Sequence, residues 1–481
     1  MLRPLALSLP LLGLLACSGG APGNGDAGAT GASDAALPLS SCQAPGGVDA
    51  LCGTLTVPED PEAPDGRSIE LAVTVLPATA STPEPDPLFA LHGGPGGAAR
   101  FLAPLFAGHP VRQDRAVVLV DQRGTGGSNP MRCIPEDPAA FILDVLRFSL
   151  DPAACEDFEA DPRFYVTPVA MDDLDRVREA LGYERINVWG GSYGARAALV
   201  YMRRHPDRVR AAVLDGVAPP TVAVPRNFAR TSQAALDDLL EDCRRAVACH
   251  RDGEGPATLL EATLERLEEA PETVTVSVPG QAASVTLPFG RRELAGSILY
   301  GLYSPQTAAL VPTAIRQAHA GAYETAAGLG VGFATVVRSQ FGVGMMLSVL
   351  CAEDAPVFTR AEMQADAQGT FLGPDFAAGL HEACAEWPVG ELPEGYHETV
   401  RSEVPTLLLS GQADPVTPPE FAAAAGAGLP ASLHVVFPDM GHGQTGTPCG
   451  AALVRAFLAA GSVEGLDVRC VAGVERPPFP G

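Results

Sequence analysis

The sequence predicts an α/β fold: a mostly parallel sheet with helices on both faces, interrupted by an inserted, mostly helical cap. Short apolar runs alternate with helical patterns in the first half of the chain, and similar runs return after residue 400. Continuous apolar strands of this kind are typical of a parallel sheet that is buried on both faces. Polar or glycine-rich segments directly follow several of these strands, which is where ligands collect in open α/β sheets.

The strands expected in the first half are short. Residues 53–57 and 69–75 alternate in polarity, and a Pro/Asp/Gly-rich turn separates them, so we expect an antiparallel pair. Buried parallel strands are then predicted at residues 87–91, 116–120, 186–189 and 209–214. A helical pattern at residues 171–181 precedes the third of these strands.

The pattern changes between residues 223 and 400. Helical patterns occur at 228–247, 257–269, 291–303 and 307–319, and one alternating stretch occurs at 273–287. Strands return at 405–410 and 433–437, which favours an insertion over a separate second domain. We therefore expect a core in two parts, residues 41–222 and 401–481, with residues 223–400 inserted as a cap.

Composition excludes several classes of function. The 481 residues carry a formal charge of -25, which argues against nucleic acid as a partner. All 32 basic residues are arginine, so Schiff-base chemistry, a Ser-Lys dyad and a lysine-containing phosphate loop are excluded. The sequence contains no evident metal-ligand cluster, and it implies no cofactor. It does not indicate the oligomeric state.

The first 17 residues predict an export signal. Arg3 precedes an apolar core at residues 5–15, which is too short to span a bilayer. The segment ends in Leu-Leu-Ala-Cys, similar to a bacterial lipobox in which Cys17 becomes lipidated; a plain secretory peptide cleaved nearby is the alternative. Residues 18–40 would form a flexible tether. We expect an exported protein of the bacterial cell envelope, periplasmic or on the outer surface, touching the membrane only through its lipid anchor.

The remaining cysteines fit an oxidising compartment. Ten are left after Cys17: Cys42, Cys52, Cys133, Cys155, Cys243, Cys249, Cys351, Cys384, Cys449 and Cys470. This even number predicts up to five disulfides. Sequence alone leaves the connectivity open, and we expect pairing of nearest neighbours along the chain.

The segment Gly190-Gly191-Ser192-Tyr193-Gly194 is the strongest motif. It is the only G-x-S-x-G in the chain, and it stands between a predicted strand and an alanine-rich helical pattern. That context is typical of a nucleophile on a sharp strand-to-helix turn. An ordinary glycine-rich turn is the alternative, and partners elsewhere in the chain decide between the two.

Two of the returning strands end in residues that could be those partners. Asp414 follows the first strand and His442 follows the second. A serine hydroxyl needs a base to take its proton, histidine suits that task near neutral pH, and an aspartate can hold the imidazole in the correct tautomer. We expect Ser192, Asp414 and His442 to form a catalytic triad. Asp439 is a rival acid that better suits a turn.

An oxyanion hole needs two backbone N–H groups aimed at the developing negative charge. We expect one from Tyr193, directly after the nucleophile. The other is expected from His92-Gly93-Gly94-Pro95-Gly96, which follows an early strand, with Gly94 favoured over Gly93. Glycines there would let the backbone approach a substrate closely.

These motifs, together with residues 121–128 (Asp-Gln-Arg-Gly-Thr-Gly-Gly-Ser), resemble the α/β-hydrolases of the proline iminopeptidase and tripeptidyl aminopeptidase type. The resemblance covers residues 41–222 and 401–470 well and the predicted cap poorly. In that family Asp121, Arg123 and Ser128 would be structural supports near the site. The resemblance implies a serine exopeptidase that hydrolyses amide bonds near a free N-terminus through an acyl-enzyme.

The resemblance also implies that carboxylates in the cap bind the substrate ammonium. Glu353 and Asp354 are the candidates, and a solvated acidic loop is the alternative. The expected partner is a peptide with a free N-terminus, of unspecified length and first residue. Two other functions stay open: a carboxylesterase on the same triad, and a non-catalytic surface lipoprotein with a hydrolase fold.

Overall fold

A computed structural model of the chain describes residues 37–155, 159–249, 255–281 and 283–480. The predicted signal peptide, Cys17 and most of the predicted tether lie outside these residues. Within the described ranges, no helix combines the length and the apolar character needed to cross a membrane.

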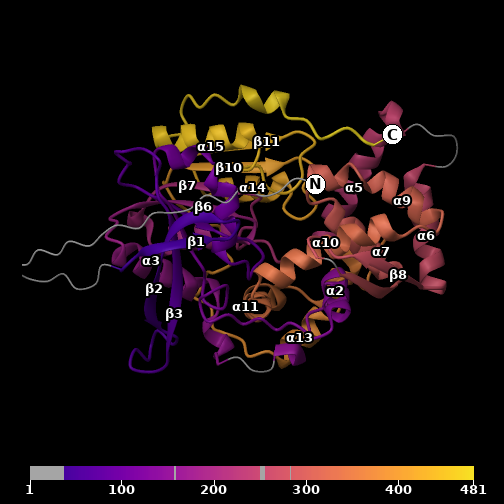
Figure 1. Cartoon of the computed structure of the whole chain (residues 1–481), viewed down its shortest axis with the longest axis horizontal. Coiled ribbons are helices and arrows are strands. Elements are labelled where there is room, and N and C mark those ends of the chain that lie inside the picture. Colours follow the sequence, from indigo (N-terminus) through magenta and orange to yellow (C-terminus); the bar gives the residue numbers. More distant parts are fainter. Residues whose placement is uncertain (1–36, 156–158, 250–254, 282, 481) are drawn as a thin grey trace, which may run out of the picture. The chain divides into compact units, whose positions relative to one another are not determined.

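A nine-stranded sheet forms the core of the described chain (Figure 1). Its strands are β1 (Ser40–Ala44), β2 (Val48–Pro58), β3 (Ser68–Leu76), β4 (Leu88–Leu91), β5 (Val117–Val120), β6 (Ile186–Gly191), β7 (Val209–Asp215), β10 (Thr406–Gly411) and β11 (Ser432–Phe437). Their order is β1-β2-β3-β5-β4-β6-β7-β10-β11. Pairs from β1 to β5 are antiparallel, and pairs from β5 to β11 are parallel. The predicted mostly parallel sheet is confirmed.

The central strands contribute side chains to two apolar clusters. Every residue of β4 and β5 is buried, as the continuous apolar runs predicted. Successive side chains point to opposite faces, so Phe89 and Val118 lie in one apolar cluster. Leu88 and Val117 lie in the other cluster. Helices supply apolar side chains to both clusters, which is why the strands read as unbroken apolar runs.

Helices around the sheet are α1 (Ala103–Ala107), α3 (Thr167–Ala180), α4 (Tyr193–Arg204), α14 (Pro419–Gly426) and α15 (Pro448–Ala460), whereas α2 (Pro138–Arg147), between β5 and α3 in the chain, lies away from them. Between β7 and β10 the chain forms α5 (Phe228–Arg245), α6 (Pro256–Glu269), α7 (Arg291–Gly301), α8 (Pro305–Ala308), α9 (Val311–His319), α10 (Glu324–Gln340), α11 (Val343–Val349), α12 (Arg360–Ala367) and α13 (Leu380–Glu386). A hairpin of β8 (Glu272–Ser277) and β9 (Ser284–Phe289) interrupts them. In Figure 1 the orange helices α7, α9 and α10 lie to the right of the labelled sheet strands.

Several features differ from the sequence expectations, which did not include β1, α11, α12 or α13. The helix expected at 307–319 is two helices, because Pro312 has no N–H to donate and is accommodated in the first turn of α9. The expectations also left out α2 and the glycine-containing α10, which pack against each other and against α7. Gly330 allows this approach: a Cβ there would lie 2.4 Å from Leu146 Cδ2 and 2.6 Å from Ser297 Oγ.

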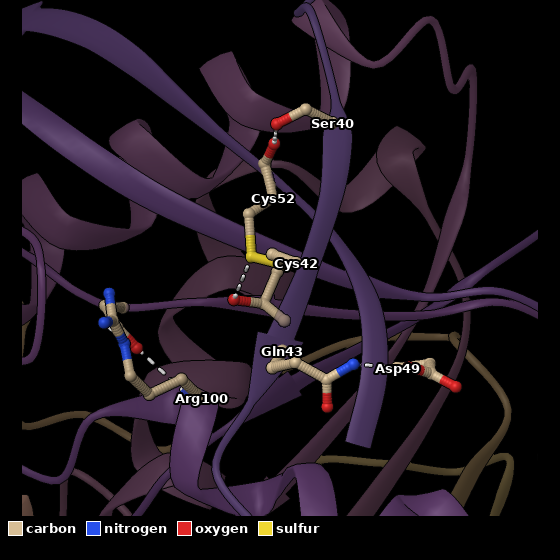
Figure 2. The surroundings of a disulfide bond; sticks show 8 residues. Ser40, Cys42, Gln43, Asp49, Cys52 and Arg100 are labelled. Carbon is tan, nitrogen blue, oxygen red and sulfur yellow. Dashed lines mark hydrogen bonds and ion pairs between the residues drawn. A yellow bond between two sulfur atoms is a disulfide. The ribbon is translucent and has the colours of Figure 1, made fainter. Parts of the chain in front are cut away.

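The ten described cysteines form five disulfides between nearest neighbours along the chain. The pairs are Cys42–Cys52, Cys133–Cys155, Cys243–Cys249, Cys351–Cys384 and Cys449–Cys470. Figure 2 shows the first of them, which joins β1 to β2 at the antiparallel edge of the sheet. Because each bridge closes a short stretch of chain, the pairing follows sequence order.

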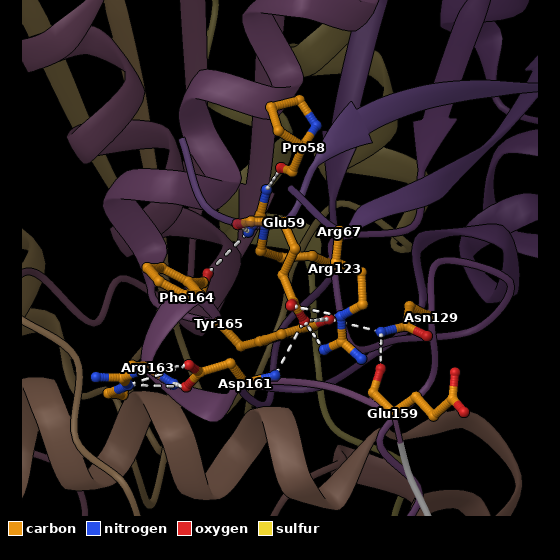
Figure 3. A network of polar contacts seen from close by, with 10 residues as sticks. All are labelled: Pro58, Glu59, Arg67, Arg123, Asn129, Glu159, Asp161, Arg163, Phe164 and Tyr165. Atoms are coloured by element: carbon orange, nitrogen blue, oxygen red, sulfur yellow. Dashed lines mark hydrogen bonds and ion pairs between the residues drawn. The ribbon is translucent and has the colours of Figure 1, made fainter. Parts of the chain in front are cut away.

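A buried arginine organises the turn after β5. The Arg123 guanidinium donates to Asp173 Oδ2 at 2.7 Å and to Asp173 Oδ1 at 3.1 Å. It also donates to the carbonyl oxygens of Pro58, Glu59 and Phe164. Figure 3 shows this side chain beside the network of Glu59 and Tyr165. The charge has a carboxylate partner and its other donors have carbonyl acceptors, as a fully buried guanidinium requires.

The predicted supports Asp121 and Ser128 lie in the same turn. Ser128 Oγ donates to the carbonyl oxygen of Asp121 at 2.6 Å and accepts the N–H of Ala72 at 2.8 Å. The Asp121 carboxylate accepts the N–H groups of Arg100 and Gly127, both at 2.9 Å. These bonds join the turn to β3 and to the segment after the glycine-rich loop.

We expect Asp173→Asn to lower the free energy of unfolding by about 3 kcal/mol, because it leaves the buried Arg123 charge without its counterion. Urea unfolding with the disulfides intact measures this loss. Arg176→Ala is the control, because Arg176 pairs with the same carboxylate from a side chain that is 37% exposed. A loss for Arg176→Ala as large as that for Asp173→Asn would contradict the argument.

Candidate active site

Ser192 occupies the sharp turn between β6 and α4. Its backbone angles are φ 58° and ψ -123°, a region that residues with a side chain rarely adopt. Glycines make the turn possible: a Cβ at Gly190 would lie 2.1 Å from the carbonyl oxygen of Gly194, and one at Gly194 would lie 2.2 Å from that of Leu91. At this motif the backbone forms a strand, a strained turn and a helix, as the sequence predicted.

Asp414 and His442 meet beyond the ends of β10 and β11. Asp414 Oδ2 lies 2.7 Å from His442 Nδ1. The Asp414 Oδ1 atom accepts the N–H groups of Val416 at 3.0 Å and Thr417 at 2.9 Å. Thr417 Oγ1 donates to Asp414 Oδ2 at 2.8 Å. The rival Asp439 has a positive φ of 54°, as a turn residue would, and it is not the acid bonded to the imidazole.

The pair is electrostatically matched. Burial acts to lower the pKa of His442, but the charge and hydrogen bond of Asp414 oppose it, so the pKa lies above its ordinary value. Burial acts to raise the pKa of Asp414, but His442 and the two N–H donors outweigh it, so the pKa lies below its ordinary value. Asp414 is therefore a carboxylate near neutral pH, and it favours the tautomer with the proton on Nδ1.

Asp215 is a third acid at this edge of the sheet, and it was not among the predicted site residues. Its carboxylate accepts the N–H of Gln444 at 2.8 Å and that of Thr445 at 2.7 Å, just after His442. Its carbonyl oxygen accepts the N–H of Ser192 at 2.8 Å. Asp215 thus joins the segment after His442, called the histidine loop below, to the turn at Ser192. It ends β7, so its position after an apolar strand was the signal that could have identified it.

The glycine-rich loop after β4 lies against Ser192. A Cβ at Gly93 would lie 2.8 Å from Ser192 Cβ and 2.9 Å from the carbonyl oxygen of Gly191. Gly94 has a φ of 124°, and a Cβ there would lie 2.8 Å from Phe341 Cε1. Both glycines are therefore required by close approach, and the loop brings its backbone to the nucleophile as predicted.

A cavity of about 490 Å³ opens beside Ser192. Ser192, His442, Gly93, Gly94 and Tyr193 all line it, whereas Asp414 lies behind the imidazole. The rest of the lining is mostly apolar and includes Phe148, Trp189, Phe228, Tyr300, Phe333 and Met346. The structure therefore brings Ser192, His442 and both oxyanion candidates to one cavity, and Asp414 is bonded to the imidazole from outside the lining.

The predicted amine-binding residues Glu353 and Asp354 are buried, and the charge of each is engaged. The Asp354 carboxylate accepts two hydrogen bonds from Arg196, at 2.9 and 3.0 Å, and one from the N–H of Val224 at 2.8 Å. Glu353 accepts the N–H of Thr167 at 2.7 Å and the hydroxyl of Tyr396, and lies 3.6 Å from Arg196. Only Asp354 of the two lines the cavity.

Among the described residues, no group of three or more histidine, cysteine, aspartate or glutamate side chains is arranged to hold a metal ion.

His92 also lines the cavity, but burial lowers its pKa to about 4, and no carboxylate of the described chain is bonded to it. Of the two imidazoles His92 and His442, His442 is the one bonded to a carboxylate.

Comparison with known proteins agrees with this geometry. A model of the alpha/beta hydrolase fold family matches residues 86–444. The serine protease Hip1 of Mycobacterium tuberculosis is 25% identical over 465 residues, 89% of this chain and 88% of that protein. The tripeptidyl aminopeptidase of Streptomyces coelicolor is 26% identical over 466 residues, 87% of this chain and 82% of that protein.

A partial match and a solved structure extend the comparison. The proline iminopeptidase of Neisseria gonorrhoeae is 31% identical over 138 residues, 29% of this chain and 34% of that protein. The crystal structure of proline iminopeptidase from Mycobacterium smegmatis covers 85% of this chain and 98% of its own, with 18% identity and a TM-score of 0.42. The match over residues 86–444 confirms the α/β-hydrolase family that the motifs indicated.

We expect Asp414→Asn to lower the pKa of His442, because the carboxylate stabilises the imidazolium. Asp215→Asn should lower it less, because Asp215 acts on the ring only through its charge. An NMR titration of the histidine ring protons measures both shifts. His434, which is bonded to Ser410, is the internal reference and should titrate unchanged. An unchanged His442 in Asp414→Asn would contradict the pairing.

Proposed function

This chain belongs to the α/β-hydrolase family, and on that premise we propose that it is a serine peptidase that removes residues from a free N-terminus. Ser192 is the nucleophile, His442 the base and Asp414 the acid that orients it. The observation that carries the proposal is the 2.7 Å bond from Asp414 to His442 Nδ1, with Ser192 and the imidazole lining one cavity.

The tautomer explains the direction of proton transfer. Because Nδ1–H donates a hydrogen bond to the Asp414 carboxylate and keeps its proton, Nε2 is free to accept the Ser192 hydroxyl proton as Oγ attacks the substrate carbonyl. His442 then gives that proton to the leaving amine, which leaves an acyl group on Oγ. A water molecule attacks the acyl group with His442 again as base, which frees the product and restores the serine.

The negative charge that develops on the carbonyl oxygen needs donors. We assign the N–H of Tyr193, at the start of α4, and the N–H of Gly94 to this oxyanion hole, with Gly93 as the second choice in the loop. The helix N-terminus adds its dipole at the same place. The contact of the loop backbone with Ser192 supports this assignment.

The relatives support peptides over other acyl substrates. Proteins named serine protease and tripeptidyl aminopeptidase align with 87–89% of this chain. The apolar cavity suits the side chains of a short peptide beside the scissile bond. A carboxylesterase would use the same three residues, so the experiment below separates the two substrates.

We further propose an exported, lipid-anchored protein. The five disulfides support an oxidising compartment. In this proposal residues 1–17 are the signal, Cys17 carries the lipid and residues 18–36 are the tether. The tether is shorter than the predicted 18–40, because Leu37 is buried and donates its N–H to Ala180, and Ser40 begins β1. Residues 223–400 act as the cap over the core formed by residues 41–222 and 401–481, and their helices supply much of the cavity lining.

We expect the protein to cleave a tripeptidyl arylamide with a free amine far faster than its N-acetylated twin. Ser192→Ala should lower kcat for the free-amine substrate by about 10⁴-fold or more, because the nucleophile is lost. Release of the arylamine measures both rates. Turnover of a short-chain aryl ester through Ser192, with both peptides inert, would establish an esterase. No reaction of Ser192 with an active-site phosphonate would favour the non-catalytic alternative.

Gly93→Ala should lower kcat by about 10²-fold, because the methyl group displaces the loop from its position near the oxyanion. Gly108→Ala is the matched control, since a Cβ at Gly108 meets nothing within 4 Å. Steady-state kinetics of the arylamide measure both variants. Equal rates for Gly93→Ala and the wild type would remove this loop from the oxyanion hole.

A further inference from the structure

Three carboxylates line the cavity beside Ser192, and two of them already have partners. Asp215 accepts the backbone N–H groups of the histidine loop. Asp354 is paired with Arg196 through two hydrogen bonds. The third is Asp144 on α2, and its carboxylate forms no hydrogen bond or ion pair with any described residue.

The surroundings of Asp144 do not compensate its charge. Arg147, one turn further along α2, donates to Glu293 Oε1 at 2.5 Å and is thereby engaged elsewhere. Val145, Phe148 and Leu150, which follow Asp144 closely in the sequence, also line the cavity and are apolar. Burial, and then the charge of Asp151, raise the pKa of Asp144 to about 6, because the opposing charge of Arg147, which is not bonded to this carboxylate, is the smaller effect. Above that pH the cavity contains a half-buried carboxylate with no partner.

An ionised carboxylate in a partly dry, apolar cavity is costly unless a cation meets it. The remaining lining offers no cation for this purpose. Arg196 is held by Asp354, and the His442 Nδ1 atom is bonded to Asp414. A substrate that enters the cavity with a positive charge would supply the missing partner. Aromatic rings such as Phe148 in the same lining are also compatible with a cation.

We propose that Asp144 is the cation subsite of this cavity. It binds an ammonium or guanidinium group of the substrate while Ser192 attacks the substrate carbonyl. The proposal rests on the proposed function. It assigns recognition of the substrate cation to Asp144 on α2 in place of Glu353 and Asp354. Asp144 lies in the segment before the nucleophile strand, so the subsite is built outside the predicted cap. Glu353 and Asp354 instead hold Arg196 and the chain around it.

The group bound has two sources, a free N-terminus or a basic side chain, and three arylamides separate them. These are a tripeptide with a free amine, its N-acetylated twin, and an N-acetylated tripeptide that contains lysine. Each is assayed at pH 8, where Asp144 is ionised in the wild type. Asp144→Asn removes the charge while keeping the shape, and it breaks no hydrogen bond of the folded protein.

For Asp144→Asn we expect kcat/KM on the free amine, relative to the acetylated twin, to fall by about tenfold to a hundredfold, the range for a hydrogen bond to a charged group. Asp151→Asn is the matched control: it removes a nearby negative charge that does not line the cavity, and the ratio should change less than twofold. A fall confined to the lysine peptide would assign the subsite to a basic side chain. An unchanged ratio for both cationic peptides would overturn the proposal.

A charge reversal gives a second readout that a merely structural role would not produce. Asp144→Arg should turn the preference toward an N-succinylated tripeptide, whose carboxylate takes the place of the ammonium. Unaltered preference in this folded variant would also overturn the subsite. Ser192→Ala, run on the same substrates, tests the proposed function separately: residual full activity there would refute the catalytic role of Ser192 whatever Asp144 does.

Discussion

The backbone conformation of Ser192 is the constraint on which the candidate site depends. A φ of 58° on a residue with a side chain persists only where the surrounding structure enforces it. Here the N–H of Ser192 is bonded to the carbonyl oxygen of Asp215, and Gly190 and Gly194 make room for the crossing backbone. The same turn ends β6 and begins α4, so it presents the hydroxyl beside a row of helix N–H groups.

The order of strands determines which side chains can reach this turn. β6 pairs with β4 on one side and with β7 on the other, and β7 is followed by β10 and β11. The glycine-rich loop, Ser192, Asp215, Asp414 and His442 therefore all follow parallel strands and meet at the same edge of the sheet. Asp215 sits between the nucleophile and the histidine loop because its strand sits between theirs.

Several buried charges of the described chain follow one rule, and the half-buried Asp144 departs from it. Arg123 meets Asp173, Arg196 meets Asp354, and Asp215 meets backbone N–H groups. Such pairing offsets the cost of removing each ion from water. Asp144 has no such partner among the described residues, and it lines the cavity beside the nucleophile, where a cationic substrate can supply one. The unpaired carboxylate in this position therefore indicates the charge of the substrate, which the net negative charge of the protein does not.

The sequence by itself indicated most strands of the sheet and the three residues that we propose as the triad. These features depend on local composition: the apolar strand runs, the glycine-rich motif at Ser192, and the polar residues that follow β10 and β11. The sequence left the disulfide connectivity open, and the structure gives the five pairs. The sequence also indicated Glu353 and Asp354 as acids of interest, because acidic residues in a predicted insertion are easy to find.

Only the tertiary structure decided which charges are free. Arg196 on α4 neutralises Asp354 from a position 158 residues away, a pairing that no local pattern contains. Asp144 was overlooked because α2 precedes the nucleophile strand, yet it packs with α7 and α10 from the later segment. Whether a carboxylate binds a substrate or holds the fold depends on what lies across from it, and that is set by packing between distant parts of the chain.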